Sequence, residues 1–352
     1  MANSKVPKLT HSSRSKGPAP SRVKVKSVTV THDKAAAQQK ASAVNIPEVA
    51  CKSSILPPSI EAMSHSRPHQ AVSYDWTAAQ QQIQQKRLFD ITVPESEYPH
   101  IIVTIPDNWP YIKIVPLYDV HIGSAEMDGE KFARDILWLA NEPYTVTFNG
   151  GDLWDNAIKA SIASSFSDDK NPNEQYSVAE DSLRLLLPKI MFGLPGNHED
   201  RTGRFADVDV AKILHNNLGI PYSPDYMMCT IKWRENRIRI LAHHGTGAAA
   251  SAGGQRNAAR KDMTWAHSFD LYWTGHLHQA LVDQIEIVYF NQESDTPTNK
   301  TVYSIISPSY LKYFGGYAAK KRLAPGARGV TSVVIQPDGR IDTETHANGK
   351  RL

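Results

Sequence analysis

A chain of 352 residues is long enough for one large or two modest domains with a full-sized core. It is 41% hydrophobic and 21% charged, and no apolar run approaches the roughly 20 residues of a membrane-spanning helix. The N-terminus lacks the apolar core of a secretory signal, and two cysteines are too few for a disulfide framework or a cysteine-rich zinc site. These features predict a protein of the reducing cytoplasm with no membrane partner.

The net charge of +3 is unevenly distributed. Residues 1–70 hold eleven Lys or Arg and three acids, a net of +8, which leaves −5 for the remainder. This segment is rich in Ser, Lys, Ala and Pro without sustained periodicity, so we expect a disordered basic arm. A basic arm of this kind is typical of proteins that contact nucleic acids. The alternative is a solvated tail without a dedicated partner, because the segment has no aromatic residue to stack on a base.

The predicted elements begin after the arm. Residues 71–98 form a linker in which 77–89 favour a short helix with Thr77 as its N-cap. The β-branched runs 100–105 and 111–120 predict two strands joined by a turn. A helix over 129–141, a strand over 144–150, a helix over 178–190 and a buried strand over 190–194 follow.

The second half continues the alternation. A helix is expected over 207–219, ending at Gly219, followed by two strands within 230–244 and one over 269–275. Residues 281–290, 301–307 and 329–336 favour antiparallel strands, which implies a mixed or second sheet. The fold class is therefore α/β, with one domain over 99–345 and a tail over 346–352.

Polar clusters stand at the ends of five predicted strands. They are Asp119–His121, Gly151–Asp155, Gly196–Glu199, His243–Gly245 and Gly275–His278. One such cluster is a weak signal, since a lone strand-end histidine is usually structural, but open α/β sheets bind ligands at this edge. Asp, Asn and His without thiolates suit divalent Mn, Fe, Zn or Ni, and two such ions about 3.5–4 Å apart can clamp a phosphoryl group.

The motifs DxH, GDxxD, GNHE, His before Gly, and GHxH, in this order, resemble the calcineurin-like metallophosphoesterases over residues 111–345. Longer stretches resemble members encoded by tailed phages and prophages: 151–161, 171–175, 196–201, 243–247 with its small-residue sequel, and 315–329. The resemblance implies a sandwich of two mixed β-sheets flanked by helices, and the host cytoplasm as location if the protein is phage-encoded.

The resemblance also implies a ligand set for two divalent ions, with Mn²⁺ favoured over Fe, Zn or Ni. One ion would be held by Asp119, His121 and His278, the other by Asn197, His244 and His276, with Asp152 between them. His198 would be the general acid, oriented by Asp155, because a carboxylate keeps an imidazole protonated and fixes its direction.

Three positions leave alternatives open. His243 and His244 point to opposite faces of a strand, and the family pattern favours His244 as the ligand. Arg201 resembles the phosphate-binding arginine that follows GNHE in protein phosphatases, the alternative being an exposed salt-bridge partner. Asn156 stands where protein Ser/Thr phosphatases carry arginine, which argues against that subclass.

Residues 245–265 carry Arg256, Arg260 and Lys261 and are either a mobile loop that brings cations over a phosphate or the start of a helix with solvated charges. Taken together, the residues predict a phosphoesterase, in particular a phosphodiesterase, in which hydroxide formed at the metals attacks phosphorus and His198 protonates the leaving oxygen. The alternatives are a DNA nuclease of the same superfamily, which the basic arm would serve, and a non-catalytic phage binding protein.

Overall fold

The computed structural model describes residues 87–158, 161, 168–247, 249, 251–291, 294–313, 319, 325–347 and 350–351. The chain divides into two units, 1–71 and 72–352, and every described residue belongs to the second. The expected basic arm, Cys51 and most of the expected helix over 77–89 lie outside the described residues. The last three residues of that expected helix, 87–89, are not helical.

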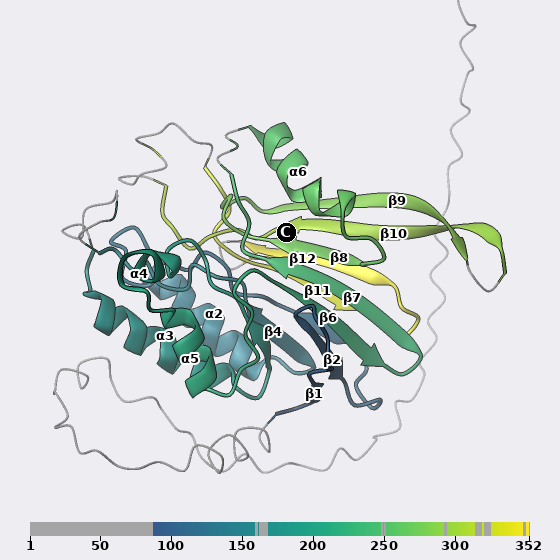
Figure 1. Ribbon diagram of the computed structural model, residues 1–352, viewed down its shortest axis with the longest axis horizontal. Coiled ribbons are helices and arrows are strands. Elements are labelled where there is room, and N and C mark those ends of the chain that lie inside the picture. Colours follow the sequence, from purple (N-terminus) through teal and green to yellow (C-terminus); the bar gives the residue numbers. More distant parts are fainter. Residues whose placement is uncertain are drawn as a thin grey trace, which may run out of the picture. The chain divides into compact units, whose positions relative to one another are not determined.

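Two mixed β-sheets form the centre of the second unit (Figure 1). The larger sheet has seven strands in the order β1 (Asp90–Thr92), β2 (His100–Thr104), β6 (Tyr226–Trp233), β7 (Asn236–His243), β8 (Leu271–Thr274), β10 (Thr296–Ile306) and β9 (Leu281–Asn291). The smaller has six, in the order β13 (Lys350–Arg351), β12 (Ile341–Ala347), β11 (Gly329–Ile335), β3 (Ile112–Ile114), β4 (Thr145–Asn149) and β5 (Ile190–Gly193). The expected α/β class with two mixed sheets is confirmed.

Parallel pairing brings the site-bearing strands into line. Strands β3, β4 and β5 run parallel in the smaller sheet, and β7, β8 and β10 run parallel in the larger one. The carboxyl ends of each set therefore meet at one edge of their sheet, which is where open α/β sheets place ligands.

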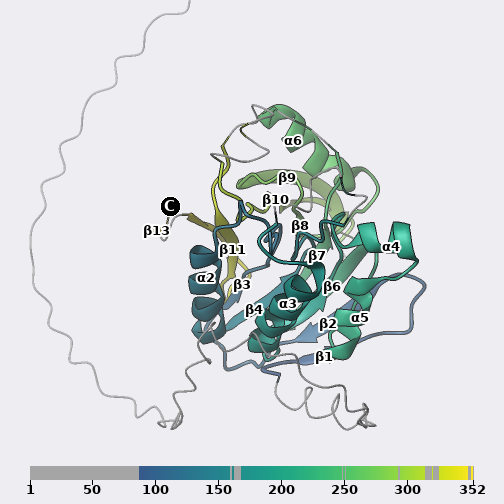
Figure 2. The ribbon, with the colours of Figure 1, turned by 90° about the vertical axis from the view of Figure 1, so that its left-hand side faces the viewer.

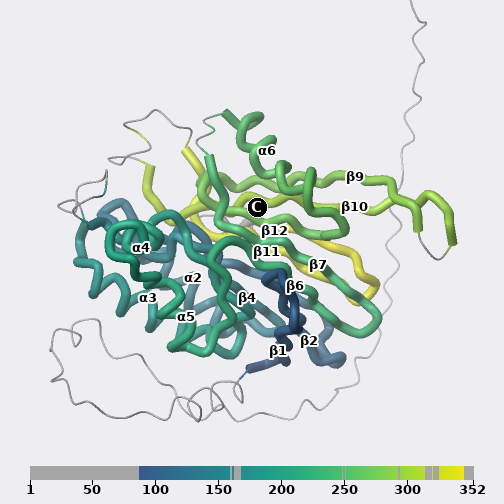
Figure 3. Tube along the Cα trace, in the orientation of Figure 1, coloured from purple at the N-terminus to yellow at the C-terminus, as the bar shows by residue number. Residues whose placement is uncertain are grey.

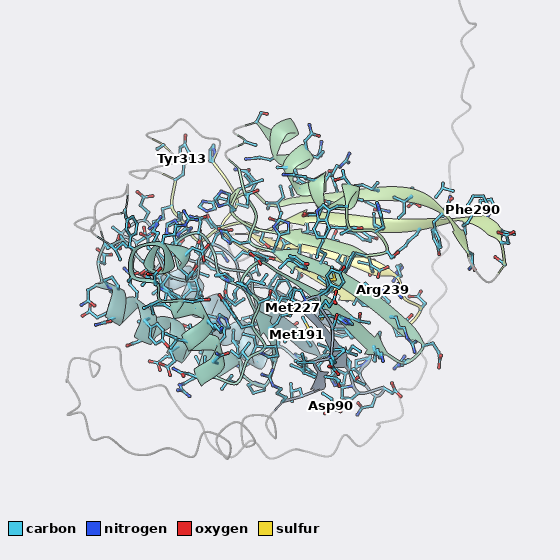
Figure 4. All side chains as sticks on the ribbon, viewed as in Figure 1. Asp90, Met191, Met227, Arg239, Phe290 and Tyr313 are labelled. Carbon is cyan, nitrogen blue, oxygen red and sulfur yellow. The ribbon has the colours of Figure 1, made fainter. Side chains whose placement is uncertain are left out.

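The main core lies between the two sheets. Alternate residues of each sheet enter it, among them Ile240 and Trp273 from the larger sheet and Phe148 and Phe192 from the smaller. Phe148 stacks on Phe192 with ring centroids 4.5 Å apart, and its edge meets Trp273. Met191 and Met227, one from each sheet, both belong to this core and lie in the interior in Figure 4.

Helices cover the outer faces of both sheets. Helices α2 (Gly129–Asn141), α3 (Pro172–Leu186) and α5 (Val210–Asn217) contribute buried residues to a second core on the smaller sheet, as Leu139, Leu183 and Leu214 show. Helix α6 (Ala252–Arg260) and the 3-10 turn η3 (Lys261–Thr264) lie over the larger sheet, away from these three helices (Figure 2). A short helix, α4 (Asp200–Ala206), follows the GNHE motif.

The structure corrects the start of one expected helix and settles two points that the sequence left open. The runs 100–105 and 111–120 are joined by a turn, but their strands β2 and β3 lie in different sheets. Helix α3 begins at Pro172, six residues before the expected start, because Asn171 caps it and accepts hydrogen bonds from the N–H groups of Asn173 and Glu174. Residues 252–260 form helix α6, the alternative to a mobile loop over that range.

The hairpin β9–β10 extends beyond the neighbouring strands (Figure 3), with Phe290 at its far end (Figure 4). No helix of the described chain is both long enough and apolar enough to span a membrane.

Candidate metal centre

The predicted ligands come from the ends of strands in both sheets. In the smaller sheet, Asp119 and His121 follow β3, Asp152 follows β4 and Asn197 follows β5. In the larger sheet, His244 follows β7, and His276 and His278 follow β8. Pairing of the strands within each sheet, and packing of the sheets on the core between them, is what brings these distant positions together.

Six of the seven predicted ligands make up two of the three compact groups that the described residues form; the third group joins His198 to His121 and Asp152. Ligand atoms of Asp119, His121 and His278 all lie within 4.8 Å of one another, and so do those of Asp152, His244 and His276. The Nε2 atom of His278 lies 3.3 Å from Asp119 Oδ1, and His244 Nε2 lies 3.2 Å from Asp152 Oδ2. The two groups adjoin each other, since Nε2 of His244 in the second group lies 3.9 Å from Oδ1 of Asp119 in the first.

Asp152 stands between the groups. Its carboxylate lies 3.9 Å from His121 of the first group as well as 3.2 Å from His244 of the second. The N–H of His198 donates to its Oδ1 at 2.8 Å, which fixes the other oxygen toward the histidines. Gly196 permits this approach, because a Cβ there would stand 2.0 Å from Asp152 Oδ1.

Five of these ligand residues adopt left-handed backbone conformations. Their φ angles lie between 50° and 65°, and they are Asp119, His121, Asp152, His276 and His278. They make up five of the eleven non-glycine residues with positive φ in the described chain. Such conformations cost of the order of 1–3 kcal/mol each and gather at functional sites, where the surrounding structure enforces them.

Several buried polar atoms of the centre lack a hydrogen bond. Within the described chain, Asp119 Oδ1, Asn197 Oδ1 and His244 Nε2 are buried without a partner of acceptable geometry, although His244 Nε2 lies near Asp152. The Nδ1 of His244 lies 3.0 Å from the carbonyl oxygen of Gly150, so Nε2 is the nitrogen that faces the cluster and would bind a metal after losing its proton. Burial of such atoms is costly unless they gain a partner, and a pair of divalent cations would satisfy all three. The donor set therefore fits a metal.

The electrostatics also suit a cation. Burial raises the pKa of Asp152, but His244 and His198 outweigh it and hold the value well below its usual range. Burial lowers the pKa of His244, but the carboxylates of Asp152 and Asp119 raise it to about 10. The carboxylates of Asp119 and Asp152, which are at most 1% exposed, therefore attract positive charge to the position between them.

The two neighbouring histidines of the fourth cluster point apart. The His244 side chain enters the cluster, whereas the His243 ring bonds the carboxylate of Asp262 on η3. The period-two alternation of strand β7 is the cause.

His198 and Asp155 lie beside the metal groups. The Nδ1 of His198 lies 2.7 Å from the carbonyl oxygen of Asp155 and 3.1 Å from its carboxylate. Asp155 also contacts Nδ1 of His121 at 3.2 Å, so one carboxylate orients two imidazoles. Burial lowers the pKa of His198, but Asp152 and Asp155 raise it to about 9. One ring nitrogen of His198 lies within 4.8 Å of ligand atoms of His121 and Asp152, and Nε2 lies 3.8 Å from Asp152 Oδ2.

Arg201 is folded back onto this pair. Its guanidinium donates to the carbonyl oxygen of Asp155 at 2.8 Å and approaches Nε2 of His198 at 2.9 Å. An arginine can only donate, so this second contact requires an unprotonated Nε2. The contact therefore competes with the proton that the raised pKa of His198 favours.

Two residues that support the site were not assigned a role from sequence. Asn156, with φ of 47°, donates from Nδ2 to the carbonyl of His198 at 2.8 Å and to Thr202 Oγ1 at 2.9 Å, so it holds the GNHE turn. Its own N–H is accepted by Gln175 on α3. Glu199 is buried beneath the same turn and bonds only backbone groups. Their positions directly after GDxxD and inside GNHE are the only sequence signal.

Two of the three cations of residues 245–265 named above are paired away from the centre. Arg256 and Arg260 on α6 both pair with Asp283 on β9, at 2.8 Å and 2.9 Å. They therefore fasten α6 to the larger sheet, and neither is a free cation for a phosphate.

No protein-family model matches the chain, and no curated protein matches it. Among solved structures it is similar to Vps29 of Chaetomium thermophilum, at 12% identity over 68% of this chain and 97% of that one, with a TM-score of 0.29. A likeness at this level carries no argument about family or activity.

Proposed function

We propose that the protein is a two-metal phosphoesterase of the calcineurin-like type, in particular a phosphodiesterase. One observation carries the proposal: carboxylate and imidazole side chains from four separate strand ends converge in two adjoining groups, with Asp152 between them. The unpartnered Oδ1 of Asn197, from a fifth strand end, completes the donor set. Oxygen and nitrogen donors of this kind suit Mn²⁺ first, with Fe, Zn or Ni as alternatives.

The proposal assigns separate roles to the metal ligands and to the general acid. Bound divalent ions would polarise the phosphoryl group and acidify a water molecule. Asp119, His121 and His278 would hold one ion, and Asn197, His244 and His276 the other. His198 would donate a proton to the leaving oxygen from Nε2, because its Nδ1 is anchored on Asp155.

Arg201 would exchange partners when substrate binds. In this structure it occupies Nε2 of His198. A phosphate ester beside His198 offers charged oxygens that an arginine prefers to a neutral imidazole. Transfer of the guanidinium to phosphate would free Nε2 to carry its proton, so Arg201 would act as a phosphate-binding residue.

The proposed substrates are phosphate esters as a class. The nuclease alternative depended on the basic arm, which lies outside the described residues, and the phage origin and cytoplasmic location stay predictions from sequence. An intact donor set argues against the binding-protein alternative, because a silenced site has no need to keep buried unpartnered ligands.

The test is hydrolysis of bis-p-nitrophenyl phosphate by metal-stripped protein after addition of Mn²⁺. Asp152→Asn should abolish both turnover and metal binding, because it weakens the ligand between the groups. His198→Gln should keep the metal content and lower kcat by about 10²–10⁴-fold, the range for loss of a general acid. Absence of turnover with Mn, Ni, Fe and Zn would refute the function, and equal metal loss in both variants would refute the role of His198.

A further inference from the structure

One buried carboxylate of the centre bonds only to the backbone. Glu199 is 2% exposed, and its two oxygens accept four backbone N–H groups. Oε1 accepts from Leu153 at 2.7 Å and Trp154 at 3.2 Å. Oε2 accepts from Asp152 at 3.0 Å and Gly196 at 2.8 Å. Both side-chain oxygens of Glu199 are therefore engaged as acceptors.

These four donors belong to two different ligand loops. Asp152, Leu153 and Trp154 follow β4, whereas Gly196 follows β5 and directly precedes Asn197. The carboxylate of Glu199 therefore ties the loop of the ligand between the two groups to the loop of a ligand of the second group. Glu199 itself is the last residue of the GNHE motif, so its backbone belongs to the second of these loops.

Two ordinary roles for a buried glutamate do not apply. Glu199 occupies the N-cap position of α4 but makes no side-chain cap hydrogen bond there, so it is not a helix cap. It also belongs to none of the metal-binding groups of the described residues, and both of its oxygens are already engaged by N–H donors. What remains is a connection between the two loops.

We propose that Glu199 is a positioning residue that sets the separation of the Asp152 and Asn197 loops and thereby the affinity for divalent cations. The inference rests on the proposed function, since it assumes that these loops hold metal. Residues that orient metal ligands typically change metal affinity 10–100-fold when they are altered.

The substitution Glu199→Gln isolates this role. Glutamine has nearly the size of glutamate, but one of its two head atoms becomes an NH₂ group, which cannot accept a hydrogen bond. Whichever way the amide turns, either the Leu153–Trp154 pair or the Asp152–Gly196 pair faces a donor. Glu199→Asp keeps both acceptor oxygens but is one methylene shorter, so it should fall between the wild type and Glu199→Gln.

The control is Asp270→Asn at the opposite end of β8 from the site. Asp270 likewise accepts a backbone N–H, from Arg239 at 2.7 Å, and pairs with Lys300 at 2.9 Å. This variant makes the same carboxylate-to-amide change without touching a ligand loop.

The experiment is calorimetric titration of each metal-stripped full-length protein with Mn²⁺, followed by electron paramagnetic resonance of the loaded samples. Glu199→Gln should bind Mn²⁺ 10–100-fold more weakly and replace the signal of a coupled pair with that of isolated ions. Asp270→Asn should match the wild type in both measurements, whatever stability it loses. The coupled signal depends on the separation of the ions, which a general loss of stability does not change.

The outcomes separate the two proposals. If the wild type binds none of Mn²⁺, Fe²⁺, Zn²⁺ and Ni²⁺ in the same titration, the proposed function fails. If the wild type binds a coupled pair and Glu199→Gln does so with equal affinity, the function stands and the role of Glu199 is wrong. Should Glu199→Gln not fold, Glu199→Asp decides, because wild-type affinity and an unchanged coupled signal in that variant would overturn the inference.

Discussion

Burial and backbone strain coincide at the ligand residues. Asp119, His121 and Asp152 are at most 2% exposed and all have positive φ, a combination that is unfavourable for both the side chain and the backbone. Their hydrogen bonds come from other loops, as when the N–H of His276 donates to Asp119 Oδ2 at 2.8 Å. The fold therefore holds these residues in conformations that they would not adopt alone, which would fix the geometry of the proposed ligands before a metal binds.

Motif residues and their supports differ in how far sequence can predict them. The order of motifs predicts His244 as a ligand and His198 as the acid; both side chains lie in the cluster, and their roles stay predictions. The hydrogen bonds of Glu199 and Asn156 could not be predicted, because their partners are backbone groups of other loops. Backbone groups are the same in every residue, so only the tertiary approach of two loops identifies such contacts.

His215 on α5 provides a prediction away from the ligands. It is fully buried: Nδ1 lies 2.7 Å from the carbonyl of Ala211, Nε2 lies 3.2 Å from Asn149 Nδ2, and Tyr222 stacks on the ring. Burial lowers the pKa of His215 to about 4, against smaller opposing effects of the Ala211 hydrogen bond and the Asp209 charge. Nε2 accepts from Asn149, so the neutral ring suits its surroundings.

The sign of the pH effect follows from this shift. Between the unfolded pKa of 6.5 and the folded value of about 4, the unfolded chain binds a proton that the folded protein does not. The contribution to the free energy of unfolding is therefore complete above pH 6.5 and declines as the pH falls, by about 2 kcal/mol at pH 5. Urea unfolding measures the free energy of unfolding at pH 7.5 and at pH 5. Between these pH values it should fall by about 2 kcal/mol less in His215→Gln than in the wild type. Equal losses in the two proteins would contradict the assignment.

At the scale of elements, strand and helix types were predictable and several boundaries were not. Strand β3 ends at Ile114, although the apolar run continues, because Pro116 cannot donate to a ladder. Strands β2 and β3 enter different sheets, which depends on partners far along the chain: β6 for β2 and β11 for β3. Local patterns contain no information on such partners.

The N-terminus of α3 connects a helix cap to the site. Asn171 accepts the N–H groups of Asn173 and Glu174, and the Glu174 side chain accepts the N–H of Asn171. In the first turn, buried Gln175 accepts the N–H of Asn156, which in turn holds the GNHE turn. The stretch 171–175, which supported the family resemblance, thus has a structural role.

Asn171→Ala should therefore lower the free energy of unfolding by about 1 kcal/mol, the usual cost of losing a cap side chain. Asn171→Asp is the matched control, because aspartate also accepts at an N-cap and carries a charge that the helix N-terminus favours. Denaturant unfolding of the three proteins measures the difference. The cap would be unimportant if alanine and aspartate at this position gave the same midpoint.

At the scale of the whole described unit, the centre lies at the seam between the two sheets. Asp119, His121, Asp152 and Asn197 belong to the smaller sheet, and His244, His276 and His278 to the larger. The apolar core between the sheets holds them together without metal, so we expect the metal-free protein to fold. A bound ion would add bonds across the seam and relieve the repulsion between buried Asp119 and Asp152.

Removal of metal should therefore lower the thermal stability of the unit. A ligand that binds only the folded state adds about 2.7 kcal/mol when its free concentration is 100 times Kd. For a domain of this size that corresponds to roughly 5–10 °C in the unfolding midpoint. Scanning calorimetry of chelator-stripped protein across a Mn²⁺ titration should show the midpoint rising with the logarithm of metal concentration above Kd. Asp152→Asn should stay near the metal-free midpoint throughout, because it weakens the carboxylate between the groups. A wild-type midpoint indifferent to Mn²⁺ would show that Mn²⁺ does not join the two sheets.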